Sequence, residues 1–133
     1  MAEKFPRPLS ANERAALDHL LSADFPGVEE LRLQAKPVRV VGRCGCGCPT
    51  IELSVDEAQP SLDEVTPRVV ATAETTDADR TGCTHLMLWV NDTDDGRRLL
   101  SGVELSWLEG PPKEFPAVEL WKLPTPEAFG VSP

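Results

Sequence analysis

The sequence predicts an α+β domain in which an N-terminal helix and a short second helix pack on an antiparallel sheet of about five strands. Before Pro37, apolar residues recur about every 3.6 residues, whereas after Pro37 they alternate with a period of two. The 133 residues are 41% apolar and 26% charged, which is close to the average for globular proteins. We therefore expect a single α+β domain with one core over residues 1–124.

The first helix is predicted to begin at Ser10, because Ser10 and Glu13 have the spacing of a capping box. An apolar stripe along one side of this helix follows, formed by Leu17, Leu20 and Leu21. Pro26 and Gly27 are expected to end the helix, because proline lacks the N–H that a further turn would need. A second, shorter helical turn is predicted over residues 28–32, where two glutamates near the start suit the helix dipole.

Five runs rich in β-branched and other apolar residues are predicted to form strands. These runs are Val38–Arg43, Thr50–Asp56, Arg68–Glu74, Thr84–Asn91 and Arg97–Leu108. Asp95-Gly96 separates the last two runs, so we expect these two to pair as an antiparallel hairpin. The inward side chains of the second and fifth runs are expected to meet the apolar stripe of the first helix.

The chain after Glu109 contains six of the 13 prolines, which disfavour regular strand pairing. The same segment carries apolar side chains at Phe115, Val118, Leu120 and Trp121. We therefore predict a proline-rich C-terminal strap that is extended and docks these side chains on the core. Residues 125–133 are expected to form a frayed tail.

Three of the four cysteines lie within five residues, at Cys44, Cys46 and Cys48. Zinc prefers tetrahedral sulfur and nitrogen ligands, and ligand sulfurs around it lie roughly 3.8 Å apart. An extended strand separates alternate residues by about 6.5–7 Å, so the two intervening glycines are needed to let the backbone curl. Cys83 or His85 would complete a set of four ligands. The cluster is therefore a candidate structural zinc site, with copper(I) as the less favoured ion.

Two other interpretations of the cysteines stay open. The three clustered cysteines share the parity of the apolar residues in the preceding strand, so they also fit buried free thiols on the same strand face. His85 likewise fits the edge of the core. A disulfide between cysteines two positions apart would be strained and easily reduced, so thiol redox chemistry is the third interpretation.

The net charge of the chain is -9, from 13 basic and 22 acidic residues. Nucleic-acid binding and adhesion to anionic membranes both rely on an excess of lysine and arginine, so the charge disfavours both classes of protein. We therefore expect a basic protein as the partner. No segment has the apolar length of a membrane span or of a signal peptide, and we therefore expect a cytoplasmic protein.

The sequence contains no motif for nucleophilic catalysis or phosphate binding, such as G-x-S-x-G or G-x-x-x-x-G-K-[ST]. We therefore expect a protein that is not an enzyme. Its size and acidity favour a protein-binding or regulatory module. The alternative function is thiolate metal binding at the cysteine cluster.

Four segments of the chain carry a resemblance to known proteins. They are Asp24-Phe25-Pro26-Gly27 with Glu29-Glu30-Leu31, Val40-Val41-Gly42-Arg43-Cys44, Cys46-Gly47-Cys48-Pro49 and Leu99-Leu100-Ser101-Gly102-Val103-Glu104-Leu105. Together they resemble a family of small uncharacterised bacterial proteins with a C-x-C-x-C segment, over most of residues 9–116. This family has no assigned activity, so the resemblance implies no catalytic role. The opening Arg7-Pro8-Leu9-Ser10 with Glu13, the size and the acidity are also similar to immunity proteins of bacterial toxin systems, which implies a protein-binding function.

Overall fold

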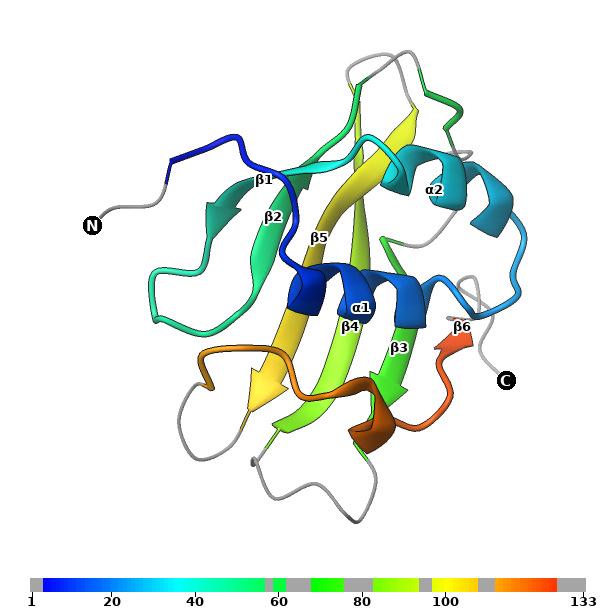
Figure 1. The fold of residues 1–133 in the computed structure, drawn as a ribbon. Helices are drawn as coiled ribbons and strands as arrows, with labels where there is room; N and C mark the ends of the chain where they lie inside the picture. Colours follow the sequence, from blue (N-terminus) through cyan, green and yellow to red (C-terminus); the bar gives the residue numbers. More distant parts are fainter. Residues whose placement is uncertain are drawn as a thin grey trace.

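Two helices lie on one face of a six-stranded antiparallel sheet, as Figure 1 shows for a computed structural model of the chain. The structure describes residues 4–56, 59–61, 68–75, 83–93, 97–107 and 112–126. The elements are α1 (Ala11–Leu20), α2 (Val28–Ala35), β1 (Arg39–Arg43), β2 (Ile51–Ser54), β3 (Val69–Glu74), β4 (Cys83–Asp92), β5 (Arg98–Trp107), the 3-10 helix η1 (Val118–Leu120) and β6 (Thr125–Pro126). The strand order is β1-β2-β5-β4-β3-β6, and all neighbouring strands are antiparallel. The α+β prediction is therefore confirmed, with six strands in place of about five.

Helix α1 begins as the capping box predicts. The Glu13 N–H donates to Ser10 Oγ at 3.1 Å, and the Ser10 N–H donates to Glu13 Oε1 at 2.8 Å. The helix ends at Leu20, several residues before the proline that was predicted to end it. Here the Ser22 hydroxyl donates to the His19 carbonyl at 2.6 Å, so a local hydrogen bond competes with a further helical turn.

Glu13 also fastens the N-terminal segment to α1. Arg7 donates to both carboxylate oxygens of Glu13, at 2.7 and 2.9 Å, and forms an antiparallel bridge with Val40 of β1. Burial alone would raise the pKa of Glu13, but hydrogen bonds from Arg7 and from the Ser10 N–H outweigh burial and lower this pKa. The charged pair therefore fastens the segment before α1 to that helix, and the backbone bridge with Val40 holds the segment against the β1 edge of the sheet.

The hydrophobic core lies between the two helices and the sheet. Its fully buried side chains include Leu17, Leu20, Leu31, Ile51, Leu86, Leu88 and Val103. The α1 stripe and the inward side chains of β2 and β5 belong to one core cluster, but the prediction that they meet directly is corrected: α1 lies mainly against β4 and β3, and it is α2 that lies against β5. In β2 the buried and exposed side chains alternate, so only one face of this strand meets the core.

Helix α2 is longer than predicted, and a buried polar side chain fastens it to the sheet. Gln34 has 0% exposure. Its Oε1 accepts from the Leu100 N–H at 2.8 Å, and its Nε2 donates to the Pro60 carbonyl at 2.6 Å. Both partners lie far from Gln34 in the sequence, so this amide positions α2 against β5.

All five predicted strands form, and their ends differ from the predicted ones by at most two residues. Strands β4 and β5 pair antiparallel, as predicted for a hairpin. Asp95 and Gly96, the expected turn of this hairpin, lie outside the described residues. Within the described ranges, no helix combines the length and apolarity that crossing a membrane requires.

The C-terminal segment passes α1 and reaches the outer edge of β3 (Figure 1). Phe115 and Trp121 are 3% and 5% exposed, so the predicted docking on the core is confirmed at these two positions. Asn12 of α1 holds the segment, because its Nδ2 donates to the Phe115 carbonyl at 2.8 Å and its Oδ1 accepts from the Phe115 N–H at 2.9 Å. Val118 differs from the prediction, since it is 39% exposed.

Thr125 and Pro126 are the first two residues of the tail that was expected to fray. They pair with Thr72 and Ala71 of β3 and form the short edge strand β6. An edge strand tolerates proline, because the missing N–H faces away from the sheet. Residues 127–133 lie outside the described part of the chain.

Candidate metal centre

The three clustered cysteines lie in the loop that joins β1 to β2 (Figure 1). Strand β1 ends at Arg43, and the Cys44 N–H donates to the Thr50 carbonyl at 3.1 Å, which closes the loop. Cys44 and Cys46 are exposed, and Cys48 is buried. The interpretation of all three as buried thiols on one strand face is therefore wrong, because the chain leaves the sheet before the first of them.

A tight turn brings the sulfur atoms together. The Gly47 N–H donates to the Cys44 carbonyl at 3.4 Å, and Gly47 has a φ of 91°, a left-handed conformation that glycine adopts at little cost. Cys44 Sγ and Cys46 Sγ lie 3.0 Å apart, and the three Sγ atoms lie within 4.8 Å of one another. Around zinc, ligand sulfurs lie roughly 3.8 Å apart, so small side-chain rotations would adapt the cluster to an ion.

Thr50 supports the buried sulfur of Cys48. Its side chain and its backbone both form hydrogen bonds with this cysteine. Thr50 Oγ1 also accepts from the Leu105 N–H of β5 at 3.0 Å, which leaves the hydroxyl proton for the sulfur. Sequence reasoning missed Thr50, because its role depends on the pairing of β2 with β5, and no local pattern indicates that pairing.

Hydrogen bonds within the loop move the pKa values of Cys46 and Cys48 apart. Burial raises the pKa of Cys48, but hydrogen bonds from Thr50 and Cys46 outweigh burial and lower it to about 7. Hydrogen bonds with Cys44 and with Cys48 raise the pKa of Cys46 to about 11. Cys48 is therefore the first of the two to become a thiolate, the form that binds metals.

The other two ligand candidates lie on β4. Cys83 begins this strand opposite Trp107 of β5, and its side chain is outside the described part of the chain. His85 is exposed and lies opposite Glu74 of β3, with 3.6 Å between His85 Nε2 and Glu74 Oε1. Among the described residues, three or more metal-ligating groups gather only at Cys44, Cys46 and Cys48. A role for Cys83 or His85 as a fourth ligand stays a prediction.

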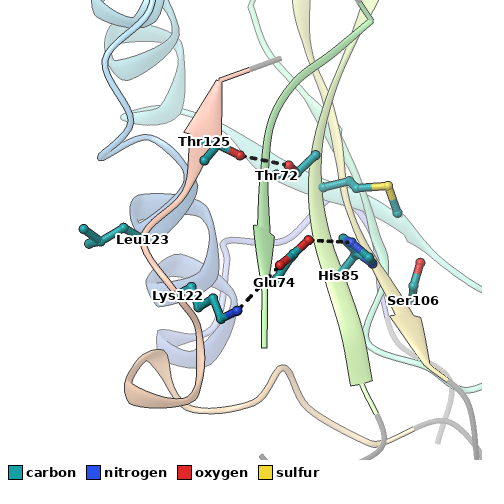
Figure 2. A pocket seen from close by; sticks show the side chains of 8 residues that line it. Thr72, Glu74, His85, Ser106, Lys122, Leu123 and Thr125 are labelled. Carbon is teal, nitrogen blue, oxygen red and sulfur yellow. Dashed lines mark hydrogen bonds and ion pairs between the residues drawn. The ribbon is translucent and has the colours of Figure 1, made fainter. Parts of the chain in front are cut away.

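His85 lines a pocket on the outer face of the sheet (Figure 2). The pocket has a volume of about 620 Å³ and is lined by Thr72, Glu74, His85, Met87, Ser106, Lys122, Leu123 and Thr125. Figure 2 shows Glu74 between His85 and Lys122, whose Nζ lies 3.8 Å from the carboxylate. The Glu74 carboxylate thus faces both the His85 imidazole and the Lys122 ammonium group. Its contact with Lys122 helps to fasten the C-terminal segment to β3. The interpretation of His85 as a residue at the edge of the core is therefore wrong, because His85 is exposed on the outer face of the sheet, and its register against Glu74 was not predicted.

Comparisons of the chain with protein-family models, with curated proteins and with solved structures found no match. The resemblances to small bacterial proteins and to immunity proteins therefore stay predictions. The structure does show the C-x-C-x-C segment as a cluster of three cysteines. This cluster is the basis for a functional proposal.

Proposed function

We propose that the protein binds a metal ion through the thiolates of Cys44, Cys46 and Cys48, with zinc as the first candidate and copper(I) as the second. The observation that carries this proposal is the gathering of three Sγ atoms within 4.8 Å of one another in a single loop. Thiolates are preferred ligands of both ions. The lowered pKa of Cys48 supports the proposal, since metal binding requires a deprotonated sulfur.

The exposure of Cys44 and Cys46 favours an ion held at the protein surface. A closed structural zinc site has four protein ligands, whereas a zinc ion with three protein ligands keeps one position for water or an incoming ligand. The loop supplies three sulfur atoms, and Cys83 and His85 are the proposed sources of a fourth ligand. Copper(I) would be satisfied by the soft thiolates alone.

Elemental analysis of the reduced protein, purified without a chelator, tests this proposal. We expect about one equivalent of zinc or copper per chain. Cys44→Ser, Cys46→Ser and Cys48→Ser should each lose most of the bound metal, because each removes one of the three loop ligands. Cobalt(II) in place of zinc gives sulfur-to-metal charge-transfer bands, and their intensity reports how many thiolates bind.

Cys83→Ser and His85→Gln are the matched variants, because they alter the β4 candidates and leave the loop intact. Loss of metal in one of them identifies the fourth ligand. If both variants retain the metal, all of its protein ligands lie in the loop. Less than about a tenth of an equivalent of either metal, with the thiols shown to be reduced, would contradict the proposal.

A further inference from the structure

The two exposed sulfur atoms of the loop lie close enough to bond to each other. Cys44 Sγ and Cys46 Sγ are 3.0 Å apart, whereas a disulfide bond measures about 2.05 Å. Small side-chain rotations therefore convert this contact into bonding distance. Both residues are exposed, so a reagent in the solvent reaches them.

The turn between these residues also suits the backbone of a disulfide. Bridged cysteines have Cα atoms about 4.4–6.8 Å apart, whereas alternate residues of an extended strand lie about 6.5–7 Å apart. The hydrogen bond from the Gly47 N–H to the Cys44 carbonyl bends the chain at this point and shortens the separation. Gly45 lies between the two cysteines, and a Cβ added to it would meet nothing within 4 Å, so the turn has room to adjust.

Cys48 has the same sequence spacing from Cys46 as Cys44 has, but its surroundings differ. Cys48 is 3% exposed and is hydrogen-bonded to Thr50. A disulfide reagent in the solvent therefore reaches Cys44 and Cys46 before it reaches Cys48. The fold thus distinguishes two C-x-C pairs that the sequence makes equivalent.

We propose that Cys44 and Cys46 form a reversible disulfide by exchange with small-molecule disulfides, and that this oxidation releases the bound metal ion. The release step rests on the metal-binding function proposed above. It follows because a Cys44–Cys46 disulfide removes two of the three loop thiolates. A single remaining loop thiolate is too few to hold the ion.

The exchange proceeds in two displacements. The thiolate of Cys44 or Cys46 attacks one sulfur of a disulfide RSSR, which forms a mixed disulfide and expels RS⁻. The other cysteine then attacks the mixed disulfide as a thiolate, which forms the Cys44–Cys46 bond and expels the second RS⁻. The two cysteines lose two electrons, RSSR gains them, and in the metal-free chain the two cysteine protons pass to the expelled thiolates. A zinc ion keeps its charge throughout.

The proposed pairing of Cys44 with Cys46 is tested by adding oxidised glutathione to the native, metal-free full chain. Two variants are compared, and each keeps one pair of cysteines with the same spacing. In a Cys83→Ser background, Cys48→Ser keeps the Cys44 and Cys46 pair, and Cys44→Ser keeps the Cys46 and Cys48 pair. We expect the internal disulfide to form on the order of tenfold faster in the Cys48→Ser chain at about pH 9, where ordinary thiols also ionise and the low pKa of Cys48 gives the other pair less advantage, because both thiols of the Cys48→Ser chain are exposed. The intact mass of the chain reports the disulfide as the loss of two hydrogen atoms. In urea the two rates should become equal, because the unfolded chain buries neither pair.

Equal rates in the native state, or a faster reaction of the Cys46 and Cys48 pair, would overturn the proposed pairing. A lasting glutathione adduct in place of the internal disulfide would also overturn the proposed pairing.

The release step is tested in the zinc-loaded wild-type chain. A colour-forming chelator should detect zinc release in step with disulfide formation, and a reductant should restore zinc binding. Zinc that stays bound after the disulfide has formed would overturn the release step. A chain that binds no zinc would contradict the proposed function but leave the comparison of the metal-free variants intact.

Discussion

Gly47 allows the turn that gathers the three sulfur atoms, since its φ of 91° lies in the left-handed region. A residue with a Cβ in this region costs about 1–2 kcal/mol. We expect Gly47→Ala to lower the free energy of unfolding by about 1 kcal/mol or more and to weaken zinc binding, because the turn would open. Urea denaturation of the metal-free chain and a zinc titration measure the two effects.

Gly45 is the matched control for this substitution, because it lies in the same turn. Its φ is outside the left-handed region, and an added Cβ would meet no atom within 4 Å. Gly45→Ala should therefore leave both the unfolding free energy and zinc binding close to the wild-type values. Equal effects of the two alanines would show that the left-handed conformation of Gly47 is not what holds the turn.

Cys48 should make the stability of the metal-free, reduced protein depend on pH. Its pKa is about 7 in the folded chain, compared with an ordinary value of 9.0 that we assign to the unfolded chain. Between these values the unfolded chain binds more protons, so the contribution of Cys48 to stability grows as the pH rises from about 7 towards 9. The same contribution is lost as the pH falls through about 7. Urea denaturation across this range measures it.

Thr50→Val is the control for this pH dependence, because valine has nearly the shape of threonine but no hydroxyl. The pKa of Cys48 should rise in the variant, since the hydrogen bond from Thr50 lowers it. The pH at which stability changes should therefore move upward. The absolute stability is not the readout, because valine also removes the acceptor of the Leu105 N–H. An unchanged pH profile would contradict the role given to Thr50.

Helix α2 depends on Gln34 for its attachment to β5. Gln34→Leu would leave the Leu100 N–H without its acceptor in a buried position, and an unsatisfied buried donor costs about 1–3 kcal/mol. We expect the unfolding free energy to fall by about that amount. Urea denaturation measures the change, with Leu33→Ala as the control because Leu33 is on α2 but 43% exposed. A larger effect at Leu33 than at Gln34 would contradict this assignment.

The start of α1 could be predicted because a local side-chain interaction determines it. The capping box at Ser10 is read directly from two side chains three residues apart, and the structure confirms it. The end of α1 was not predicted. The apolar stripe favours a longer helix, whereas the hydrogen bond from the Ser22 hydroxyl to the His19 carbonyl competes with a further helical turn. Strand β6 escaped prediction because proline disfavours regular pairing, although an edge position tolerates it.

Two pairings of the sheet, β2–β5 and β3–β6, join strands that are not consecutive in the sequence, and no local pattern predicts them. The β1–β2 and β4–β5 pairs join neighbours in sequence, and the β4–β5 hairpin was predicted. The β2–β5 pair joins segments about fifty residues apart, and this pair places Thr50 beside Leu105. The cysteines of the candidate site were therefore evident in the sequence, whereas the exposure of two of them and the support of the third were not.

The net charge of -9 belongs to the molecule as a whole, and it motivates the prediction of a basic protein partner. If the acidic surface drives association, binding should be strongest at low ionic strength and should weaken as salt screens the charges. A pull-down from lysate at low and at high salt, followed by affinity measurement with the captured basic protein, tests this. Capture of no partner at either salt concentration would contradict the prediction.

The loop with the three cysteines is supplied by one uninterrupted stretch of chain at the tip of a hairpin. Its closing bond, from the Cys44 N–H to the Thr50 carbonyl, is one that any antiparallel hairpin of this length can make. Surface loops accept replacement more readily than the strands that carry them. The hexapeptide Cys44-Gly45-Cys46-Gly47-Cys48-Pro49 is thus a short unit that protein engineers can graft onto another hairpin to supply three sulfur ligands. The low pKa of Cys48 should transfer with it only if the new host also places a threonine hydroxyl and a neighbouring strand N–H as Thr50 and Leu105 do here.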